Sequence, residues 1–386
     1  MPTITEHSAK INATLPKGVV NAKMEVFYNP LMVSNRNISV LLLNSVANKN
    51  MNIALPLAGS GIRGLRFLQE LKKGKIGQLF VNDKKENFVN NFKNNFKSNN
   101  LTTEKISIHN EDANLFLLNQ IKHPETEQFC GYFDYIDLDP FGTPNPFISA
   151  SVARITRNGI IAVTATDTAA LTGTYPKVTK RKYWSTALKN HMMHEIGLRI
   201  LIRKVQLQGI QFDKALTPIL AYHKDHYFRI YFQSQNGKER CDEIVNQHKF
   251  MLFCPQCLDY KICNQNCGTC ECETITKDNT DLQFAGPLWS GPLFDKKLIN
   301  KIANTNSKNN IFPEEQKFLD LLKEESKQDL VGFYDMHTIA RKYKLNSPRM
   351  EQILKQLKAT RTHFSPLGIK TKLNIKEIVK KIKQLK

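Results

Sequence analysis

Short apolar runs alternate with amphipathic segments over the first half of the chain. Five runs have the length and composition of buried strands: Met51–Ala58, Gly77–Asn82, Lys105–His109, Phe133–Leu138 and Gly159–Thr164. Between them, Gly64–Lys73 and Lys84–Lys97 are predicted helices, and Phe88, Phe92 and Phe96 recur every four residues on one helix face. This alternation predicts an α/β fold with a mostly parallel sheet that is covered by helices on both faces.

The pattern changes in the second half of the chain. A long helix is expected at His191–Gln208, and Ala215–His223 with His226–Gln233 predicts an antiparallel hairpin at the sheet edge. Cysteines and basic residues then become frequent, so we place a boundary near residue 240, giving domains 1–240 and 241–386.

The C-terminal domain is expected to be a smaller α+β unit. Asp335–Tyr343 and Pro348–Lys358 resemble a helix–turn–helix, and Ala359–Leu373 resembles a hairpin wing. A winged-helix module, which often binds nucleic acid, and an ordinary helical packing domain both fit this pattern.

Charge adds a candidate partner. The 386 residues carry a net charge of +20, and from Thr338 to Lys386 there are 14 Lys and Arg against two Glu, a net +12. A biased base composition of the genome would also raise the lysine and asparagine content, but the concentration of charge favours a polyanion such as nucleic acid. No apolar run is long enough for a membrane span, and the N-terminus lacks a signal-peptide core. We therefore expect a cytoplasmic protein with no membrane partner and no evident obligate protein partner.

A glycine-rich loop follows the first predicted strand. Gly59, Gly61 and Gly64 form G-x-G-x-x-G, and Asp83 lies nineteen residues after Gly64, at the end of the next strand. Glycines allow close backbone approach to a ligand, and an acid at that point suits ribose hydroxyls, so a nucleoside-containing cofactor is predicted. NAD and S-adenosylmethionine share this layout. Asp112 and the Ala113 backbone, after the third strand, are placed to hold an adenine, which favours S-adenosylmethionine; a helix N-cap is the alternative role for Asp112.

The fourth strand ends in Asp137-Leu138-Asp139-Pro140-Phe141-Gly142. Parallel strands present their carboxyl ends to ligands, so Asp139, Pro140 and Phe141 are candidate catalytic residues. Asp139 or the carbonyls around Pro140 could accept hydrogen bonds from an exocyclic amine, and Phe141 could stack on a base. Asp137 is expected to support the loop. A strand end with capping carboxylates and a turn proline is the alternative, but two acids in an apolar run are costly to bury without a partner or a use.

A set of ordered blocks extends this interpretation: Phe27-Tyr28-Asn29-Pro30 with Asn35-Arg36, Gly61–Arg66, Asp137–Gly142, Ala165-Thr166-Asp167 and Gly286-Pro287-Leu288-Trp289. In this order the blocks resemble the tRNA guanine-26-N2 dimethyltransferase family, whose members are class I methyltransferases with a Rossmann-like domain. The resemblance spans about residues 25–295. It implies that Arg36 and Arg66 are cofactor-pocket residues, joining Asp83, Asp112 and Ala113. It also implies that Phe27 lines the guanine pocket opposite Phe141.

Six cysteines lie within 19 residues: Cys254, Cys257, Cys263, Cys267, Cys270 and Cys272. Cys254/Cys257 and Cys267/Cys270 are each C-x2-C, and four thiolates at such spacing predict a structural zinc site. Cys263 or Cys272 could replace a member of the second pair. In the resembled family only some members have such a site.

Basic and aromatic residues alternate in Tyr175–Lys189, which follows the fifth strand and is expected to contact RNA. A solvated helix with inward-packing aromatics is the alternative.

Together these features predict an enzyme that dimethylates guanine N2 in tRNA from S-adenosylmethionine, with a zinc-containing, tRNA-binding C-terminal domain. An adenine N6 or other RNA or DNA base methyltransferase is the enzymatic alternative, and a non-catalytic RNA-binding protein with a vestigial cofactor fold is the second. An NAD-linked dehydrogenase ranks third.

Overall fold

The computed structural model of the chain describes residues 2–14, 26, 28–119, 131–270, 272, 282–328, 330–346 and 348–385. Phe27, the predicted guanine-pocket residue, lies outside the described residues. Among those described, no helix combines the length and apolar composition that crossing a membrane requires.

A seven-stranded sheet forms the centre of the molecule, in the order β5-β4-β3-β6-β7-β9-β8. The strands are β3 (Met51–Leu55), β4 (Ile76–Asn82), β5 (Ile106–His109), β6 (Phe133–Leu138), β7 (Ile155–Ala165), β8 (Lys214–Lys224) and β9 (Tyr227–Asn236). The first five are parallel, and β9 and β8 complete the edge in antiparallel pairing. The predicted Rossmann-like α/β fold with an antiparallel edge is confirmed. The order reverses between β3 and β6, the switch point at which such sheets bind ligands.

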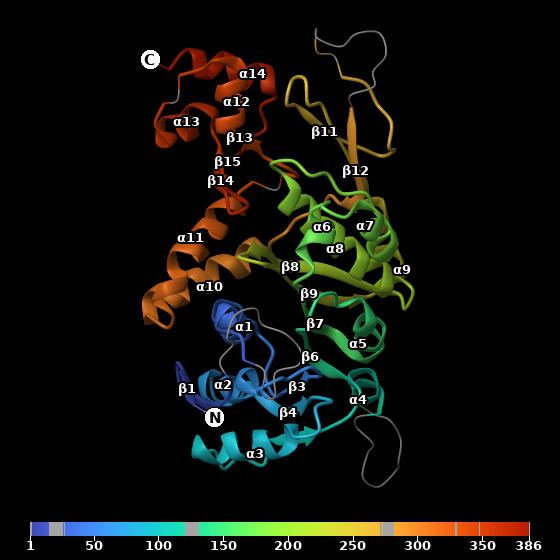
Figure 1. The fold of residues 1–386 in the computed structure, drawn as a ribbon, viewed down its shortest axis with the longest axis vertical. Coiled ribbons are helices and arrows are strands. Elements are labelled where there is room, and N and C mark those ends of the chain that lie inside the picture. Colours follow the sequence, from blue (N-terminus) through green and yellow to red (C-terminus); the bar gives the residue numbers. More distant parts are fainter. Residues whose placement is uncertain are drawn as a thin grey trace.

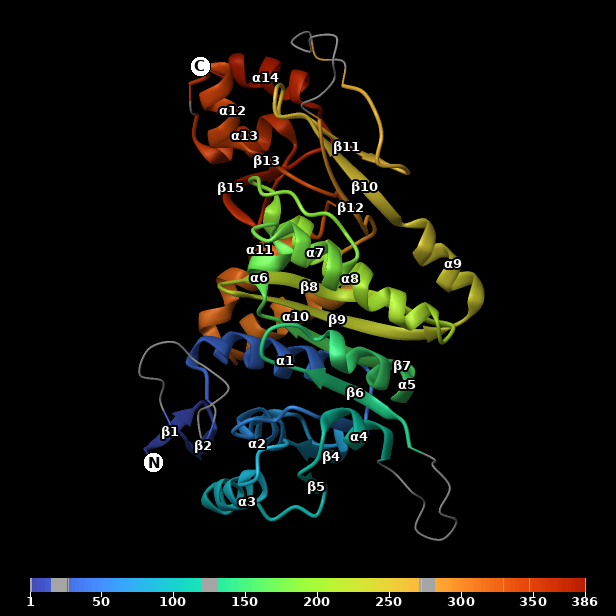
Figure 2. The same cartoon turned by 45° about the vertical axis from the view of Figure 1, so that its right-hand side comes forward.

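Helices cover both faces of this sheet (Figures 1 and 2). The helices of this half are α1 (Val33–Ser45), α2 (Ile62–Glu70), α3 (Phe88–Ser98), α4 (Ala113–Asn119), α5 (Ile148–Arg154), α6 (Thr168–Leu171), α7 (Pro176–Tyr183), α8 (Met193–Ile210) and α9 (Lys238–Asn246). Phe88 and Phe92 on α3 are buried and Phe96 packs against the core, as the spacing predicted. A short hairpin of β1 (Thr3–Glu6) and β2 (Ala9–Asn12), which the sequence pattern did not predict, packs against α2 and α3.

The later strands form two small sheets. One contains β10 (His248–Phe253), β11 (Tyr260–Cys263) and β12 (Gln283–Trp289), and the other contains β13 (Tyr334–Asp335), β14 (Thr360–Thr362) and β15 (Ser365–Lys370). The remaining helices are α10 (Lys296–Asn309), α11 (Gln316–Glu325), α12 (Met336–Tyr343), α13 (Met350–Leu357) and α14 (Ile375–Lys383). Helices α12 and α13, followed by the β14–β15 hairpin, have the element order of the predicted helix–turn–helix and wing.

The C-terminal elements pack closely on the half that contains the seven-stranded sheet. Helix α10 lies against α1, and Phe294 bridges to Leu220 on β8. Figures 1 and 2 show α6, α7 and α8 between the seven-stranded sheet and the β10–β12 sheet. The predicted boundary near residue 240 coincides with the end of the main sheet at Asn236, and it stays a prediction for independent folding units.

Candidate active site and metal centre

A cavity of about 750 Å³ opens at the carboxyl ends of β3, β4, β6 and β7. The residues lining it come from α1 and the turn before it, from α2, from β6, from the loops after β3, β4, β6 and β7, and from the β8–β9 turn. They include Tyr28, Asn29, Leu31, Arg36, Gly59, Ser60, Arg63, Asp83, Lys84, Asp137, Asp139, Pro140, Phe141, Thr166, Asp225, His226 and Tyr227. The glycine loop and the Asp-Pro-Phe-Gly loop therefore share one space.

Asp83 shapes the glycine loop. Its Oδ2 accepts a hydrogen bond from the Gly59 backbone N–H at 2.8 Å, and its Oδ1 accepts one from the Lys85 N–H at 3.1 Å. Gly59 and Gly61 have φ values of 58° and 77°, which favour glycine. A Cβ on Gly61 would also lie 2.2 Å from the Phe92 ring, so this glycine makes room for the core beneath the loop.

Asp139 and Asp137 have different surroundings, although both contact Arg63. Asp139 accepts a hydrogen bond from Arg63 Nη2 at 2.6 Å, and its side chain is 22% exposed towards the cavity. Asp137 is buried, 3.3 Å from Arg63 and 2.8 Å from Arg229, and it accepts a bond from the Tyr135 hydroxyl. Burial alone would raise the pKa of Asp137, but the two guanidinium groups outweigh it and hold the pKa below its usual value. Asp139 is thus the acid placed to meet a ligand.

The loop after Asp139 is fixed by backbone contacts. The Gly142 N–H donates to Thr166 Oγ1 at 2.8 Å, and the Thr166 N–H donates to the Gly142 carbonyl at 2.9 Å. Phe141, held next to this pair, is 48% exposed and lines the cavity. An exposed ring beside a carboxylate provides a stacking surface for a flat ligand.

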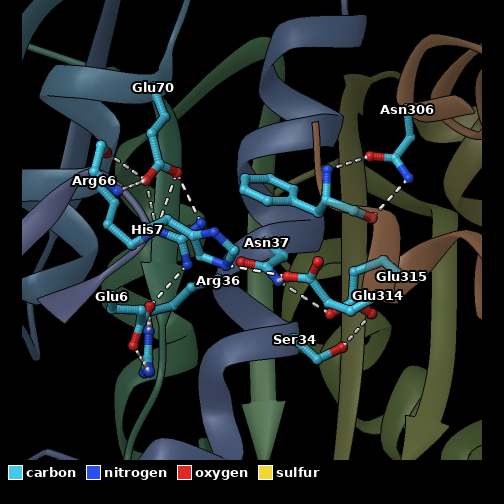
Figure 3. Close-up of polar contacts among 12 residues, drawn as sticks. Glu6, His7, Ser34, Arg36, Asn37, Arg66, Glu70, Asn306, Glu314 and Glu315 are labelled. Carbon is cyan, nitrogen blue, oxygen red and sulfur yellow. Dashed lines mark hydrogen bonds and ion pairs between the residues drawn. The ribbon is translucent and has the colours of Figure 1, made fainter. Parts of the chain in front are cut away.

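Arg36 and Arg66 meet at Glu6 of the N-terminal hairpin (Figure 3). Glu6 accepts bonds from Arg36 Nε at 2.7 Å and Arg66 Nη1 at 2.8 Å, and Arg66 also contacts Glu70 at 2.8 Å. Burial would raise the pKa of Glu6, but both arginines outweigh it and lower the pKa to about 2. The Tyr28 hydroxyl also donates to Glu6, and burial with this carboxylate raises the pKa of Tyr28 to about 12. Arg36 reaches the cavity wall, whereas Arg66 is wholly buried and is absent from the described lining.

The third-strand loop caps a helix. Asp112 Oδ1 accepts from the N–H groups of Asn114 and Leu115, at 2.9 and 3.3 Å, as expected for the N-cap role. Neither Asp112 nor Ala113 is among the described residues that line the cavity. Asn82 ties this loop to its neighbour: its Nδ2 donates to the Pro56 and Glu111 carbonyls.

Four thiols converge after β10: Cys254, Cys257, Cys270 and Cys272, whose sulfur atoms all lie within 4.8 Å of one another. Cys272 occupies the place that the sequence spacing gave to Cys267, which is exposed with its Sγ 3.5 Å from Gln265 Oε1. In this structure Cys270 and Cys272, rather than Cys270 and Cys267, face the first pair, and which thiols bind a metal stays a prediction. The donor set suits a closed tetrahedral cation site.

Comparisons with known proteins place this geometry in a family. Residues 4–383 match the model of the "N2,N2-dimethylguanosine tRNA methyltransferase" family. The chain belongs to this family. A relative from Aquifex aeolicus, a "tRNA (guanine(26)-N(2)/guanine(27)-N(2))-dimethyltransferase", is 36% identical over 100% of this chain and 96% of its own length. A "tRNA (guanine(26)-N(2))-dimethyltransferase" from Saccharolobus solfataricus is 35% identical over 99% of both chains.

A solved structure matches along its whole length. The complex of Trm1 from Pyrococcus horikoshii with S-adenosyl-L-methionine has a TM-score of 0.84 and 32% identity, and the match covers 99% of this chain and 100% of that one. The predicted family and fold are thereby confirmed.

The structure brings most of the predicted site residues of this dimethyltransferase-family chain together. Six line one cavity: Arg36, Gly59, Asp83, Asp139, Pro140 and Phe141. The roles assigned to Gly61, Arg66, Asp112 and Ala113 in holding a cofactor stay predictions, since their described contacts are with the protein. Sequence reasoning missed Arg63 and the Asp225–His226 turn. Arg63 stands inside the glycine motif and offered a signal; the turn offered none, because only the β8–β9 pairing carries it to the cavity.

Proposed function

We propose that this protein transfers methyl groups from S-adenosylmethionine to the exocyclic N2 amine of guanine 26 in tRNA, forming N2,N2-dimethylguanine. The observation that carries the proposal is the placement of Asp139, Pro140 and Phe141 across one cavity from the Gly59 loop and Asp83. The names of the family and of its relatives support the substrate, and the S-adenosylmethionine complex of the matched structure supports the methyl donor.

The cavity has the features that this donor requires. S-adenosylmethionine, when bound, supplies an electrophilic methyl group on a sulfonium centre. The Gly59 loop offers close backbone approach, Asp83 would accept hydrogen bonds from ribose hydroxyls, and Arg36 on α1 would supply a cation for the carboxylate of the cofactor.

Asp139 acts on the amine. The lone pair of a guanine amine is delocalised into the ring, so an acceptor beside the amine makes it a better nucleophile as it loses a proton. Arg63 holds Oδ2 of Asp139, and Oδ1 has no partner among the described residues, which leaves it for the amine. Phe141 stacks on the base, and positioning against the methyl group supplies much of the rate. The guanine must leave its stack to reach this depth.

One assay tests the proposal. The protein is incubated with methyl-labelled S-adenosylmethionine and unmodified tRNA, the tRNA is digested, and the labelled nucleoside is identified and mapped. Labelled N2,N2-dimethylguanosine at position 26 is expected. Absence of transfer would leave the vestigial RNA-binding alternative, and labelled methyladenosine would leave the adenine one. Label at position 27 would place the chain with its Aquifex relative, whose name includes that position.

We also propose that Cys254, Cys257, Cys270 and Cys272 hold a structural Zn²⁺ and that the C-terminal elements bind tRNA. Burial raises the pKa of the Cys257 and Cys270 thiols, so a cation would be needed to stabilise their thiolates. The free cysteines among the described residues suit a reducing compartment such as the cytoplasm.

A further inference from the structure

Helix α7 carries an exposed aromatic side chain at each end and basic side chains between them. Tyr175, just before the helix, is 58% exposed, and Trp184, just after it, is 52% exposed. Lys180 and Arg181, near the end of the helix, are exposed as well. Large aromatic rings are usually buried because their transfer from water to the protein interior is favourable. Two exposed rings on one short basic helix therefore indicate a binding surface.

The fold holds Trp184 in place from its C-terminal side. Its backbone is left-handed, with φ 52°, a conformation that costs energy in residues other than glycine. The next two residues are fixed to β12: Ser185 Oγ donates to the Pro287 carbonyl at 2.9 Å, and Thr186 exchanges backbone bonds with Gly286 at 2.9 and 2.7 Å. The indole is therefore presented by a rigid backbone.

The other side of α7 is bonded to the active-site loop. The hydroxyl of Tyr183, the last helical residue, donates to Asp167 at 2.6 Å and lies 3.1 Å from Thr143 Oγ1. Asn145 Nδ2 donates to the Lys182 carbonyl at 2.9 Å. Thr143 and Asn145 lie two and four residues after Phe141, so the end of α7 is bonded to the same loop that lines the cavity.

The indole also has a cation behind it. Lys204 Nζ on α8 lies 3.1 Å from the centre of the Trp184 ring, while about half of the side chain stays exposed. Tyr175 and Trp184 are nine residues apart along a helix, which separates their backbones by about 13 Å, a span of a few nucleotides. Aromatic rings interleaved with cations are the surface on which single-stranded nucleic acid binds without base specificity.

We propose that α7, with Tyr175 and Trp184 at its ends, is the docking surface for the RNA strand that carries the target guanine. Trp184 stacks on a base beside the target, and Lys180 and Arg181 contact its phosphates. Withdrawal of the target base from the stack leaves its neighbours without a stacking partner, which this surface supplies. The inference rests on the proposed function and deepens it by naming where the strand on either side of the guanine lies.

The test compares variants of the full-length protein by their affinity for unmodified tRNA. Trp184→Ala is expected to raise Kd and KM for tRNA about tenfold, with the loss on KM rather than kcat, and Trp184→Phe to restore most of the affinity. The double variant Lys180→Gln/Arg181→Gln is expected to make the dependence of log K on log salt less steep by about 1.5 units. Lys93→Gln/Lys97→Gln, which removes two exposed cations from α3, outside the C-terminal elements, is the matched control and should leave that slope nearly unchanged.

The outcomes separate this inference from the proposed function. If the unaltered protein transfers no methyl group, the proposed function fails, but the tRNA affinities still test the surface. If Trp184→Ala binds tRNA as tightly as the unaltered protein, the inference is overturned. A lower melting temperature, with losses of S-adenosylmethionine and tRNA affinity in proportion, would also overturn it by assigning Trp184 a packing role. If the α3 control changes the salt slope equally, the contact is general charge attraction and α7 is not the docking surface.

Discussion

Arg63 joins two carboxylates that have different tasks. Asp137, buried between Arg63 and Arg229, completes a charge cluster inside the fold, whereas Asp139 uses the same guanidinium as a support and faces the cavity. A buried ion pair that loses one charge leaves the other unpaired, which is far more destabilising than the pair is stabilising. The same substitution should therefore lower activity at Asp139 and stability at Asp137.

Asp139→Asn is expected to lower kcat by about 10²- to 10⁴-fold, since it removes the proton acceptor, while S-adenosylmethionine affinity and melting temperature stay close to those of the unaltered protein. Asp137→Asn is expected to lower the free energy of unfolding by about 3–5 kcal/mol because Arg229 and Arg63 lose their shared partner. Steady-state kinetics, ligand titration and thermal melting of both variants give the comparison. An active Asp139→Asn enzyme would remove Asp139 from the chemistry.

Glu6 predicts a pH dependence of stability. Its pKa falls from 4.5 to about 2 on folding, so its ionised form favours the folded state. The contribution, on the order of 3 kcal/mol, is fully present above the unfolded pKa and is lost as the pH falls from about 4.5 towards 2. Glu6→Gln should therefore be much less stable than the unaltered protein at pH 6, and the difference in melting temperature should shrink towards pH 3.

Glu324→Gln is the control for this measurement. Glu324 forms an exposed pair with Lys327 at 2.6 Å, and such pairs contribute little to stability. Its difference from the unaltered protein should stay small at every pH. A pH-independent difference for Glu6→Gln would show that the arginines do not depress the Glu6 pKa in solution.

At the residue scale, sequence predicted best where the chemistry is local. Asp139, Pro140 and Phe141 are adjacent in the chain and stay adjacent in the cavity. Glu6 could not be predicted as the partner of Arg36 and Arg66, because these residues are separated by 30 and 60 positions, and only the packing of the β1–β2 hairpin joins them.

At the scale of elements, the strands were easier to predict than helix α1. Strands β3 to β7 are short apolar runs because the helices bury both faces of the sheet. Almost all of α1 is buried, including Asn35, Arg36 and Asn37, so no exposed polar face marks its period. These polar side chains are satisfied by distant groups: Asn37, for example, donates to Glu314 and Glu315. A helix whose polar residues have tertiary partners gives no amphipathic signal.

In the cysteine-rich segment after β10, either Cys272 or Cys267 could be the fourth zinc ligand, and the two assignments can be compared directly. We expect the protein to contain one zinc ion per chain, to lose it in Cys272→Ser together with several degrees of melting temperature, and to keep it in Cys267→Ser. Elemental analysis and thermal melting of both variants are the measurements. Loss of zinc from Cys267→Ser alone would show that the ligands are the two C-x2-C pairs that the spacing favoured. If the unaltered protein and both variants contain no zinc, the proposed zinc site is wrong.

At the scale of the whole molecule, buried charges join the C-terminal elements to the catalytic half. Lys370 on β15 lies 2.9 Å from Glu195 on α8 and 3.5 Å from Glu325 on α11, and Glu325 also contacts His363 at 2.6 Å. Arg199 on α8 adds bonds to the Glu195 carboxylate and to the Trp289 carbonyl. Burial would raise the pKa of Glu325, but His363 and Lys370 outweigh it and lower the pKa to about 2. The Glu325 carboxylate therefore stays ionised, and these contacts hold the C-terminal elements against α8.

If the C-terminal elements bind tRNA as proposed, the relative placement of the two halves is part of substrate binding. A tRNA that contacts the C-terminal elements can present its guanine to the cavity only if both surfaces keep their spacing, so a weakened junction should reduce affinity for tRNA more than affinity for the small cofactor.

Lys370→Met leaves two buried carboxylates facing each other and should lower the free energy of unfolding by about 3–5 kcal/mol. Below the new melting temperature it should raise KM for tRNA several-fold with little change in S-adenosylmethionine affinity. Lys372→Met removes an exposed lysine two residues away, and it should alter neither quantity by more than a small factor. Equal stability and equal KM for tRNA in the two variants would mean that the buried charge of Lys370 does not hold the junction together. A loss of cofactor affinity in Lys370→Met would mean that the C-terminal elements stabilise the methyltransferase fold itself and not only the placement of tRNA.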